Sequence, residues 1–364
     1  MQLRGRKQIA AVGGAVAVAL LAACSSSTTS APPAATGGAT SGSTSAALSG
    51  TLNGSGSTFQ APFQEQAIQN FKSVQSGMTV NYGGGGSGKG RTDLASGVVN
   101  FAGSDSPVPS KEASNFAGKT VLYFPVVIGP ITLSYNLSGV SNLKLDATTI
   151  ANIFQAKIKT WNDPAIKALN SGVTLPSTPI TIAVRSDSSG TTQNFSLFLD
   201  TAVPSVWTLG SSSTISWPST ARAGNGNSGV AQIVKSTAGA IGYVDYADAK
   251  ASGLTYASVK NKDGNYVAPS PESASAAAAG TTVKPDLTFH AVWAPGANAY
   301  PITYQSWDLV IQAQSSSNTA KMLQAYIGYL LGPGQQILPS LGYAALPASL
   351  DTQAKAQLDK IGTL

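Results

Sequence analysis

The chain has 364 residues, of which 42% are hydrophobic and 10% are charged, with a formal net charge of +6. This length allows one large domain or two lobes with separate cores, and the hydrophobic share is ordinary for a globular protein. The charged share is well below the usual quarter or so, which favours an extracytoplasmic protein, and the mild charge without a basic run interleaved with aromatics excludes typical nucleic-acid binders.

The chain contains one cysteine, Cys24, and one histidine, His290. A single cysteine excludes intramolecular disulfides and cysteine-rich zinc sites, and a Ser-His triad would have to use His290. That histidine lies in the stretch "TFHAVW", which carries no other catalytic signal, and no acidic cluster suggests a metal site. We therefore expect no catalytic residue, no metal and no cofactor.

The first 23 residues have the pattern of a secretory signal. Three basic residues, Arg4, Arg6 and Lys7, precede an apolar stretch that is shorter than the roughly 20 residues a membrane span needs. Their removal would lower the net charge from +6 to +3, since no acidic residue lies among them. The following "LAAC" resembles a bacterial lipobox, in which the cysteine, here Cys24, becomes the lipidated first residue. The alternative is an ordinary signal peptide with an unrelated cysteine.

Residues 24–48 consist almost entirely of Ser, Thr, Ala, Gly and Pro. Such a segment cannot bury enough apolar surface to order itself, so we predict a flexible tether. A lipid on Cys24, a tether and a globular body together predict an exported protein that is anchored to the outer face of the cell membrane.

The first half of the body alternates between strand and helix patterns. Phe63, Ala67 and Phe71 recur near helical spacing, and Pro62 suits the first turn of that helix. The run over 120–136 is apolar and β-branched, which predicts one strand or two in succession. The other expected elements are a strand that ends in a Gly/Ser turn within 50–59, a strand that runs into glycine within 78–86, the end of a strand at 100–105, and helices over 61–74 and 90–99.

The second half continues the alternation. Asp146 is a predicted N-cap for a helix that carries Ile150, Ile153 and Phe154 on one face. We further predict strand, turn and helix over 179–199, helix, turn and strand over 224–249, and a helix over 318–332 that glycine and proline end. Repeated strand–turn–helix units indicate an α/β architecture. The chain shows no repeat of roughly 20–50 residues, which disfavours solenoids and propellers.

Three turns between a strand and a helix share one chemistry: "GSGSTF" (54–59), "GGGGSGKG" (83–90) and "RSDSSGTT" (185–192). Glycine lets the backbone approach a ligand, hydroxyls donate hydrogen bonds, and the first turn of a helix has free N–H groups that bind oxyanions. The second turn resembles a nucleotide-binding loop, but Gly90 stands where that loop needs a hydroxyl for Mg²⁺. We interpret the turns as an oxyanion site without a metal; the alternative for each turn is a simple helix cap.

Two charged residues accompany these turns. Arg185 opens the third turn and can grip an oxyanion with two hydrogen bonds. Asp105 would repel an anion unless the ligand carries a proton that the carboxylate can accept. Phosphate carries such a proton near neutral pH and sulfate does not, so this acceptor would discriminate strongly between them. The alternative is that Asp105 and Arg185 are unrelated surface charges.

Seven stretches, taken in order, resemble the phosphate-binding protein of bacterial phosphate ABC importers, and the match runs from about Leu48 to the C-terminus. The stretches are "GSGSTFQAPF", "VNYGGGGSGKG", "VNFAGSDSPV", "VRSDSSGTTQNF", "GAIGYVDYA", "YPITYQSWDLV" and "GYAALP". The resemblance implies a two-lobed periplasmic-binding-protein fold of type II, α/β with mixed sheets flanked by helices and a hinge. Lobe I would comprise 49–127 and 299–364, and lobe II would comprise 128–298.

The resemblance also implies a phosphate site between the lobes. Asp105 would accept the ligand's proton, and Phe59 would donate its backbone N–H. Asp187 matches an acidic position near the mouth of the cleft, and Lys89, where a small residue is commoner, is expected to face solvent. The segment between the first and second turns is one residue longer than in some members of the family, so the exact contacts around Ser87 stay open. The implied phosphate-binding residues are Thr58, Phe59, Ser87, Asp105, Arg185, Ser189, Gly190 and Thr191.

The implied function is binding of inorganic phosphate and its delivery to the transmembrane permease subunits of an ABC importer with a cytoplasmic ATPase, by a monomer that is not an enzyme. One alternative is a binding protein for another oxyanion, such as sulfate or molybdate. A secreted phosphate-ester hydrolase is a second, although Ser87 or Ser189 would need His290 or a metal as partner. A surface adhesin without small-ligand affinity is a third.

Overall fold

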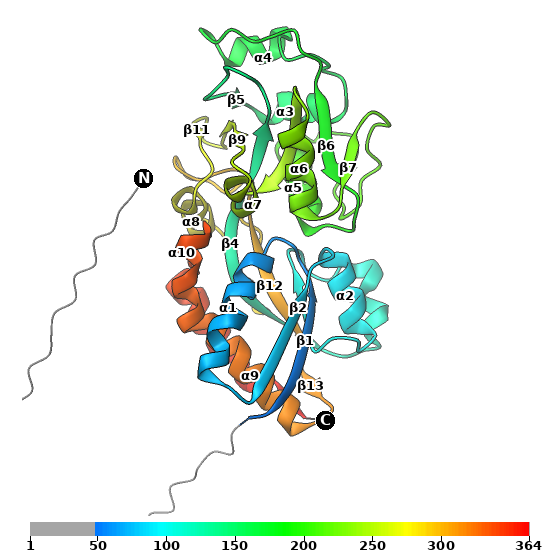
Figure 1. Cartoon of the computed structure of the whole chain (residues 1–364), viewed down its shortest axis with the longest axis vertical. Helices are drawn as coiled ribbons and strands as arrows, with labels where there is room; N and C mark the ends of the chain where they lie inside the picture. Colours follow the sequence, from blue (N-terminus) through cyan, green and yellow to red (C-terminus); the bar gives the residue numbers. More distant parts are fainter. Residues whose placement is uncertain (1–47, 364) are drawn as a thin grey trace, which may run out of the picture. The chain divides into compact units, whose positions relative to one another are not determined.

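Strand β4 (Val121–Tyr135) connects two parts of one mixed sheet (Figure 1). The computed structural model describes residues 48–363, so the predicted signal, Cys24 and nearly all of the predicted tether lie outside the described residues. β4 is antiparallel to β12 (Thr303–Ile311) as far as Pro130, and to β8 (Ala240–Asp245) from Ile131 onward. The run over 120–136 is therefore one strand. We call the strand order β2 (Met78–Gly83), β1 (Gly50–Gly56), β3 (Phe101–Ser104), β12 and β4 the first half-sheet. The second half-sheet has the order β4, β8, β6 (Thr181–Arg185) and β7 (Arg222–Gly224), with β9 (Thr255–Tyr256) beside β4.

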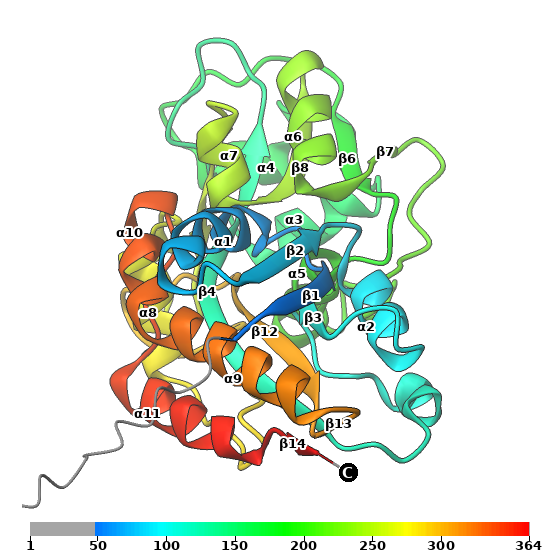
Figure 2. The same ribbon diagram turned by 60° about the horizontal axis from the view of Figure 1, so that its bottom comes forward.

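The first half-sheet begins with parallel strands joined by helices. β1 (Gly50–Gly56) lies between β2 (Met78–Gly83) and β3 (Phe101–Ser104), and the connections are α1 (Ala61–Val74) and α2 (Ser87–Ala95). Figure 2 shows α1 and α9 (Ser317–Leu331) on one side of β1 and β2 and α2 on the other. Phe63, Ala67 and Phe71 are buried, which confirms the predicted apolar face of α1.

The second half-sheet places β6 (Thr181–Arg185) parallel to β8 and to β7 (Arg222–Gly224). The helices α5 (Gly190–Ala202) and α6 (Gly226–Ser236) follow β6 and β7. The predicted cap of α3 (Ala147–Phe154) is confirmed, because the Asp146 carboxylate accepts from the Thr149 amide at 2.8 Å. The described residues, 48–363, lie in one unit whose sheet runs through β4 without a break, so the boundaries of the two lobes stay a prediction.

Helix α9 ends before Gly332 and Pro333 as predicted.

Shorter elements complete the structure. The remaining strands are β5 (Lys144–Leu145), β9 (Thr255–Tyr256), β10 (Ser258–Lys260), β11 (Tyr266–Val267), β13 (Ala313–Gln314) and β14 (Gly362–Thr363). The remaining α-helices are α4 (Pro164–Leu169), α7 (Tyr246–Ala251), α8 (Pro271–Ala279), α10 (Leu338–Leu341) and α11 (Ala348–Gln357). Within residues 48–363, no helix combines the length and the apolar character needed to cross a membrane.

The predicted helix over 90–99 is wrong in its position, because α2 begins at Ser87. The glycines of this stretch predicted a longer turn, whereas Gly90 is needed because the helix packs closely against β1. A Cβ at position 90 would lie 2.6 Å from the Ser55 carbonyl oxygen and 2.7 Å from the Gly56 Cα. Gly90 therefore belongs to the helix and lets α2 lie directly on β1. The turn itself ends at Gly86, whose φ of 90° favours glycine.

Asp308 is a fully buried carboxylate on β12. The side-chain amide of Gln64 donates to both of its oxygens, at 3.1 and 3.0 Å. Burial raises the pKa of Asp308 to about 7, although hydrogen bonds from Gln64 and Gln60 act in the opposite direction. A carboxyl with a raised pKa in the folded state favours folding while it is protonated, and that contribution disappears as the pH rises through the folded pKa.

We therefore expect the free energy of unfolding to fall as the pH rises from about 4, the unfolded pKa, to about 7. Roughly three pKa units correspond to a loss of up to about 4 kcal/mol. The measurement is urea unfolding at pH 4.5, 6 and 8 for the wild type and for Asp308→Asn, which cannot titrate. Asp105 and Asp245 also have raised pKa values, so the slope of the variant should shrink rather than vanish. Equal slopes for the two proteins would contradict the prediction.

Candidate anion-binding site

Asp105, which directly follows β3, is the residue on which the site converges. The residue is 1% exposed, and each of its polar atoms is hydrogen-bonded. Its amide donates to the Ser87 hydroxyl at 3.1 Å, and its carbonyl oxygen accepts from the Asn194 side chain of α5 at 2.7 Å. The contact with Asn194 joins the end of β3 in the first half-sheet to a helix that packs on the second.

Three hydroxyls surround the Asp105 carboxylate. Ser57 and Ser306 donate to Oδ1 at 2.5 and 2.6 Å, and Ser87 donates to Oδ2 at 3.2 Å. Burial raises the pKa of Asp105, while these hydroxyls and the positive charge of Arg185 act in the opposite direction. The site therefore holds a carboxyl group whose charge depends on the donors around it.

The start of α5 packs directly against Asp105. A Cβ at position 190 would lie 2.6 Å from the Asp105 Cβ and would also collide with Asp105 Oδ2 and the Ser87 hydroxyl. Only glycine fits between these groups, so the free N–H groups of the first turn of α5 lie at the carboxylate. Ser189 caps this helix, because its hydroxyl accepts from the Thr192 amide at 3.1 Å.

Arg185 ends β6 and is buried. Its guanidinium forms an ion pair with Asp187, in which Nε lies 2.8 Å from Oδ1. Its Nη1 donates to the Thr191 hydroxyl at 3.3 Å and to the Asn227 side chain at 3.1 Å. Burial works against the ionised form of Asp187, but the hydrogen bond and charge of Arg185 outweigh it and hold the pKa of Asp187 below its ordinary value. The arginine thus brings a buried positive charge to the start of α5.

The first turn supplies Thr58 and Phe59. The Thr58 hydroxyl accepts from the Asn227 side chain of α6 at 3.1 Å. The Phe59 amide donates to the Ser57 hydroxyl at 3.1 Å, and its ring stacks on Tyr304 with the ring centres 3.9 Å apart. The amide of Phe59 is therefore linked through Ser57 to the carboxylate of Asp105.

The eight residues predicted for the site lie at the starts of α1, α2 and α5, at the end of β6 and just after β3. Their roles as ligand contacts stay predictions. Sequence reasoning missed four polar residues that hold the site together: Ser57, Asn194, Asn227 and Ser306. Ser57 lies within the turn "GSGSTF" and could have been found there, and Asn194 and Ser306 lie in stretches that carry the family resemblance, whereas nothing in the pattern around Asn227 points to this place.

Two other predictions concern residues near the site or its chemistry. The Lys89 side chain is 53% exposed and pairs with Asp93, so it faces solvent as expected. His290 is exposed, and partial desolvation with the nearby charge of Lys284 lowers its pKa. Across residues 48–363, no three His, Cys, Asp or Glu side chains gather closely enough to hold a metal ion.

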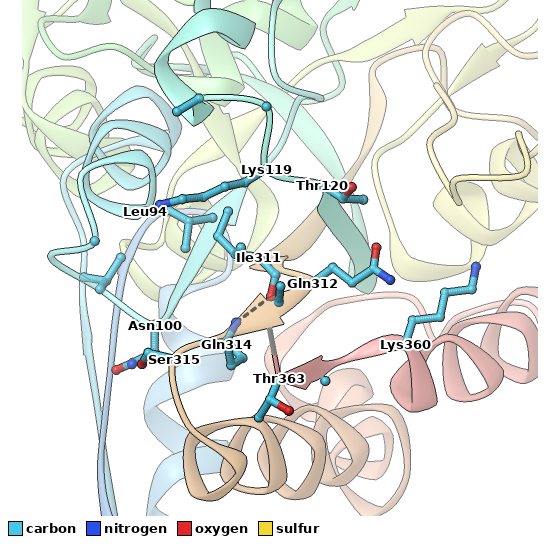
Figure 3. A pocket seen from close by; sticks show the side chains of 16 residues that line it. Leu94, Asn100, Lys119, Thr120, Ile311, Gln312, Gln314, Ser315, Lys360 and Thr363 are labelled. Carbon is cyan, nitrogen blue, oxygen red and sulfur yellow. Dashed lines mark hydrogen bonds between the residues drawn. The ribbon is translucent and has the colours of Figure 1, made fainter.

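A groove with a volume of ≈ 660 Å³ lies elsewhere in the structure (Figure 3). Its lining includes Leu94, Ile311, Gln314 and two exposed lysines, Lys119 and Lys360, and none of its lining residues belongs to the three glycine-rich turns. An anion beside exposed lysines keeps much of its hydration, and the attraction is weak there. The buried donors around Asp105 are therefore the better candidate for an oxyanion site.

The sequence matches the PBP superfamily domain over residues 41–333. It is 34% identical to phosphate-binding protein PstS 3 of Mycobacterium leprae over 319 residues, which cover 84% of this chain and 86% of that protein. It is 35% identical to phosphate-binding protein PstS 2 of Mycobacterium tuberculosis over 322 residues, with coverage of 84% and 86%.

Solved structures show the same fold. A high-affinity periplasmic phosphate-binding protein with bound phosphate superimposes with a TM-score of 0.69 at 21% identity and covers 85% of this chain and 94% of that one. The phosphate-binding protein of Stenotrophomonas maltophilia gives 0.66 at 20% identity, with coverage of 84% and 93%. The predicted α/β binding-protein fold is confirmed.

Proposed function

Because the chain belongs to the family of PstS phosphate-binding proteins within the PBP superfamily, we propose that it binds inorganic phosphate around Asp105. One observation carries the proposal: a buried carboxylate stands among the starts of three helices, and a serine from the segment at each of these starts lies at or near it. Helix starts attract anions, whereas a carboxylate at the same place repels them. The two fit together when the bound anion carries a proton that the carboxylate can accept.

The ligand would be held by fixed donors rather than by a metal. Helix α5 supplies Ser189, Gly190 and Thr191, and Arg185, whose guanidinium is paired with Asp187, adds a buried positive charge that attracts phosphate. The hydroxyls of Thr58 and Ser87 and the amide of Phe59 complete the set. These donors would replace the hydration shell of phosphate, and the Ser87 hydroxyl and the Phe59 amide would turn to the ligand from Asp105 and Ser57, to which they donate in the structure.

The proposal extends to transport without a catalytic step. Contacts between the half-sheets, such as Asn194 with Asp105 and Asn227 with Thr58, fit a hinged closure of two lobes over the ligand. The loaded monomer would then deliver phosphate to the transmembrane permease subunits of an ABC importer. A lipid on Cys24 would keep it at the outer face of the membrane.

Isothermal titration calorimetry of the protein, freed of bound phosphate by unfolding and refolding, tests the proposal. We expect tight binding of phosphate, competition by arsenate, which has a similar shape and proton, and much weaker binding of sulfate and molybdate. Equal binding of sulfate would favour a binding protein for another oxyanion. The absence of binding heat with all of these anions would overturn the proposal. Turnover of a chromogenic phosphate ester at a rate that scales with protein concentration would contradict the absence of catalysis.

A further inference from the structure

The two carboxylate oxygens of Asp105 have different surroundings. Oδ1 accepts from Ser57 of the first turn at 2.5 Å and from Ser306 of β12 at 2.6 Å. Both serines are buried, Ser57 and Ser306 each with an exposed fraction of 0%. A carboxylate oxygen has two lone pairs, so two donors at these distances fill the hydrogen-bonding capacity of Oδ1.

The proton of Ser57 is committed to this contact. Its oxygen already accepts from the amides of Phe59 at 3.1 Å and of Gln60 at 3.4 Å, so its O–H is directed at Asp105. Ser306 has Asp105 as its hydrogen-bond partner in the described structure. Both are buried hydrogen bonds to a charged acceptor, and such bonds contribute more to stability than bonds between neutral groups.

Oδ2 has capacity left. Its donor is Ser87 at 3.2 Å, a longer contact, and the Ser87 oxygen itself accepts from the Asp105 amide. Oδ2 also lies against Gly190 at the start of α5, where a Cβ would collide with it. The oxygen with an open lone pair is therefore the one that faces the third helix start.

We propose that Ser57 and Ser306 are positioning residues that determine specificity: by filling Oδ1 they keep Asp105 an ionised acceptor and present Oδ2 to the proton of the bound phosphate. This inference rests on the proposed function and goes beyond it, since neither serine touches the ligand. Without the two hydroxyls the buried carboxyl would take up a proton itself and could then donate to an unprotonated anion such as sulfate.

The other ionisable groups that act on Asp105 are consistent with its role as an ionised acceptor. Arg185 stabilises the ionised carboxylate. Three tyrosines interact with the charge of Asp105 and have pKa values raised first by burial, so they remain neutral: Tyr82, Tyr304 and Tyr343. Among the uncharged hydroxyls, Ser306 and Ser57 therefore oppose proton uptake by Asp105 more strongly than Ser87 does.

The test compares wild type, Ser57→Ala, Ser306→Ala and the double variant by calorimetry with phosphate and with sulfate between pH 5 and 8. Ser134→Ala is the matched control, because it removes a buried hydroxyl that bonds to Thr132 instead. Each serine-to-alanine change at the site should weaken phosphate binding about tenfold, and the double change about a hundredfold. Sulfate binding should stay constant or strengthen, and phosphate affinity should begin to fall on acidification at a higher pH than in wild type.

Ser306→Thr, which keeps a hydroxyl at this position, should retain most of the selectivity that Ser306→Ala loses if the role of Ser306 is positioning. Wild-type affinity, selectivity and pH profile in the double variant would overturn the inference. An equal loss for both anions with an unmoved pH profile would also overturn it, because that result describes a purely structural role. If wild type itself binds no phosphate, the proposed function fails, and that failure is visible before any variant is made.

Discussion

Gly190→Ala should reduce phosphate affinity about a thousandfold while the protein stays folded. The added Cβ would lie 2.6 Å from the Asp105 Cβ and collide with Ser87, so the start of α5 would have to move away from the carboxylate. The amides of the first helical turn and the Thr191 hydroxyl would then miss the ligand. Losing about three hydrogen bonds to an anion, at roughly 1.4 kcal/mol each, corresponds to this factor.

The backbone at Gly190 does not require glycine, since its φ lies outside the left-handed region. Alanine also favours helix by up to about 1 kcal/mol, so thermal unfolding without ligand should change little. Gly362→Ala is the control, because it adds the same methyl group where no atom lies within 4 Å. Calorimetry of both variants checks the prediction, and phosphate affinity within threefold or so of wild type for Gly190→Ala would refute it.

Local patterns predicted much of the fold because the relevant forces act over a few residues. The spacing of Phe63, Ala67 and Phe71 predicted α1, and Asp146 predicted the start of α3, since a helix buries one face and needs a cap at its first turn. The position of α2 was wrong, because whether Gly90 belongs to a turn or to a helix depends on how closely β1 lies to it. That distance is set by tertiary packing.

The same limit applies to the site. Glycine and serine before a helix predict an anion-binding turn through helix geometry alone, and three such turns do meet at Asp105. Ser306, in contrast, lies 201 residues from Asp105 and reaches it because β12 pairs with β3. The double pairing of β4 that positions β12 and β8 also depends on distant partners, so no spacing rule applied to one segment predicts it.

Asp105→Asn should lower the ratio of phosphate affinity to sulfate affinity by about 10⁴, the scale on which a site built around one hydrogen bond rejects the wrong partner. The amide oxygen would remain with Ser57 and Ser306, which donate to Oδ1 in the native protein. The amide NH₂ would then replace Oδ2 and face the ligand as a donor. Phosphate would lose the acceptor for its proton, and sulfate would gain a donor where it met a negative charge.

Asp308→Asn is the control for this prediction, because it makes the same replacement at a second buried carboxylate of the first half-sheet. Calorimetry with both anions at one pH should show the native ratio for Asp308→Asn and the collapsed ratio for Asp105→Asn. The apo Asp105→Asn protein should unfold at an equal or higher temperature, since a carboxylate whose charge is opposed by burial has been neutralised. An unchanged anion ratio would show that Asp105 does not read the ligand's proton, and a parallel loss of both anions would assign it a structural role.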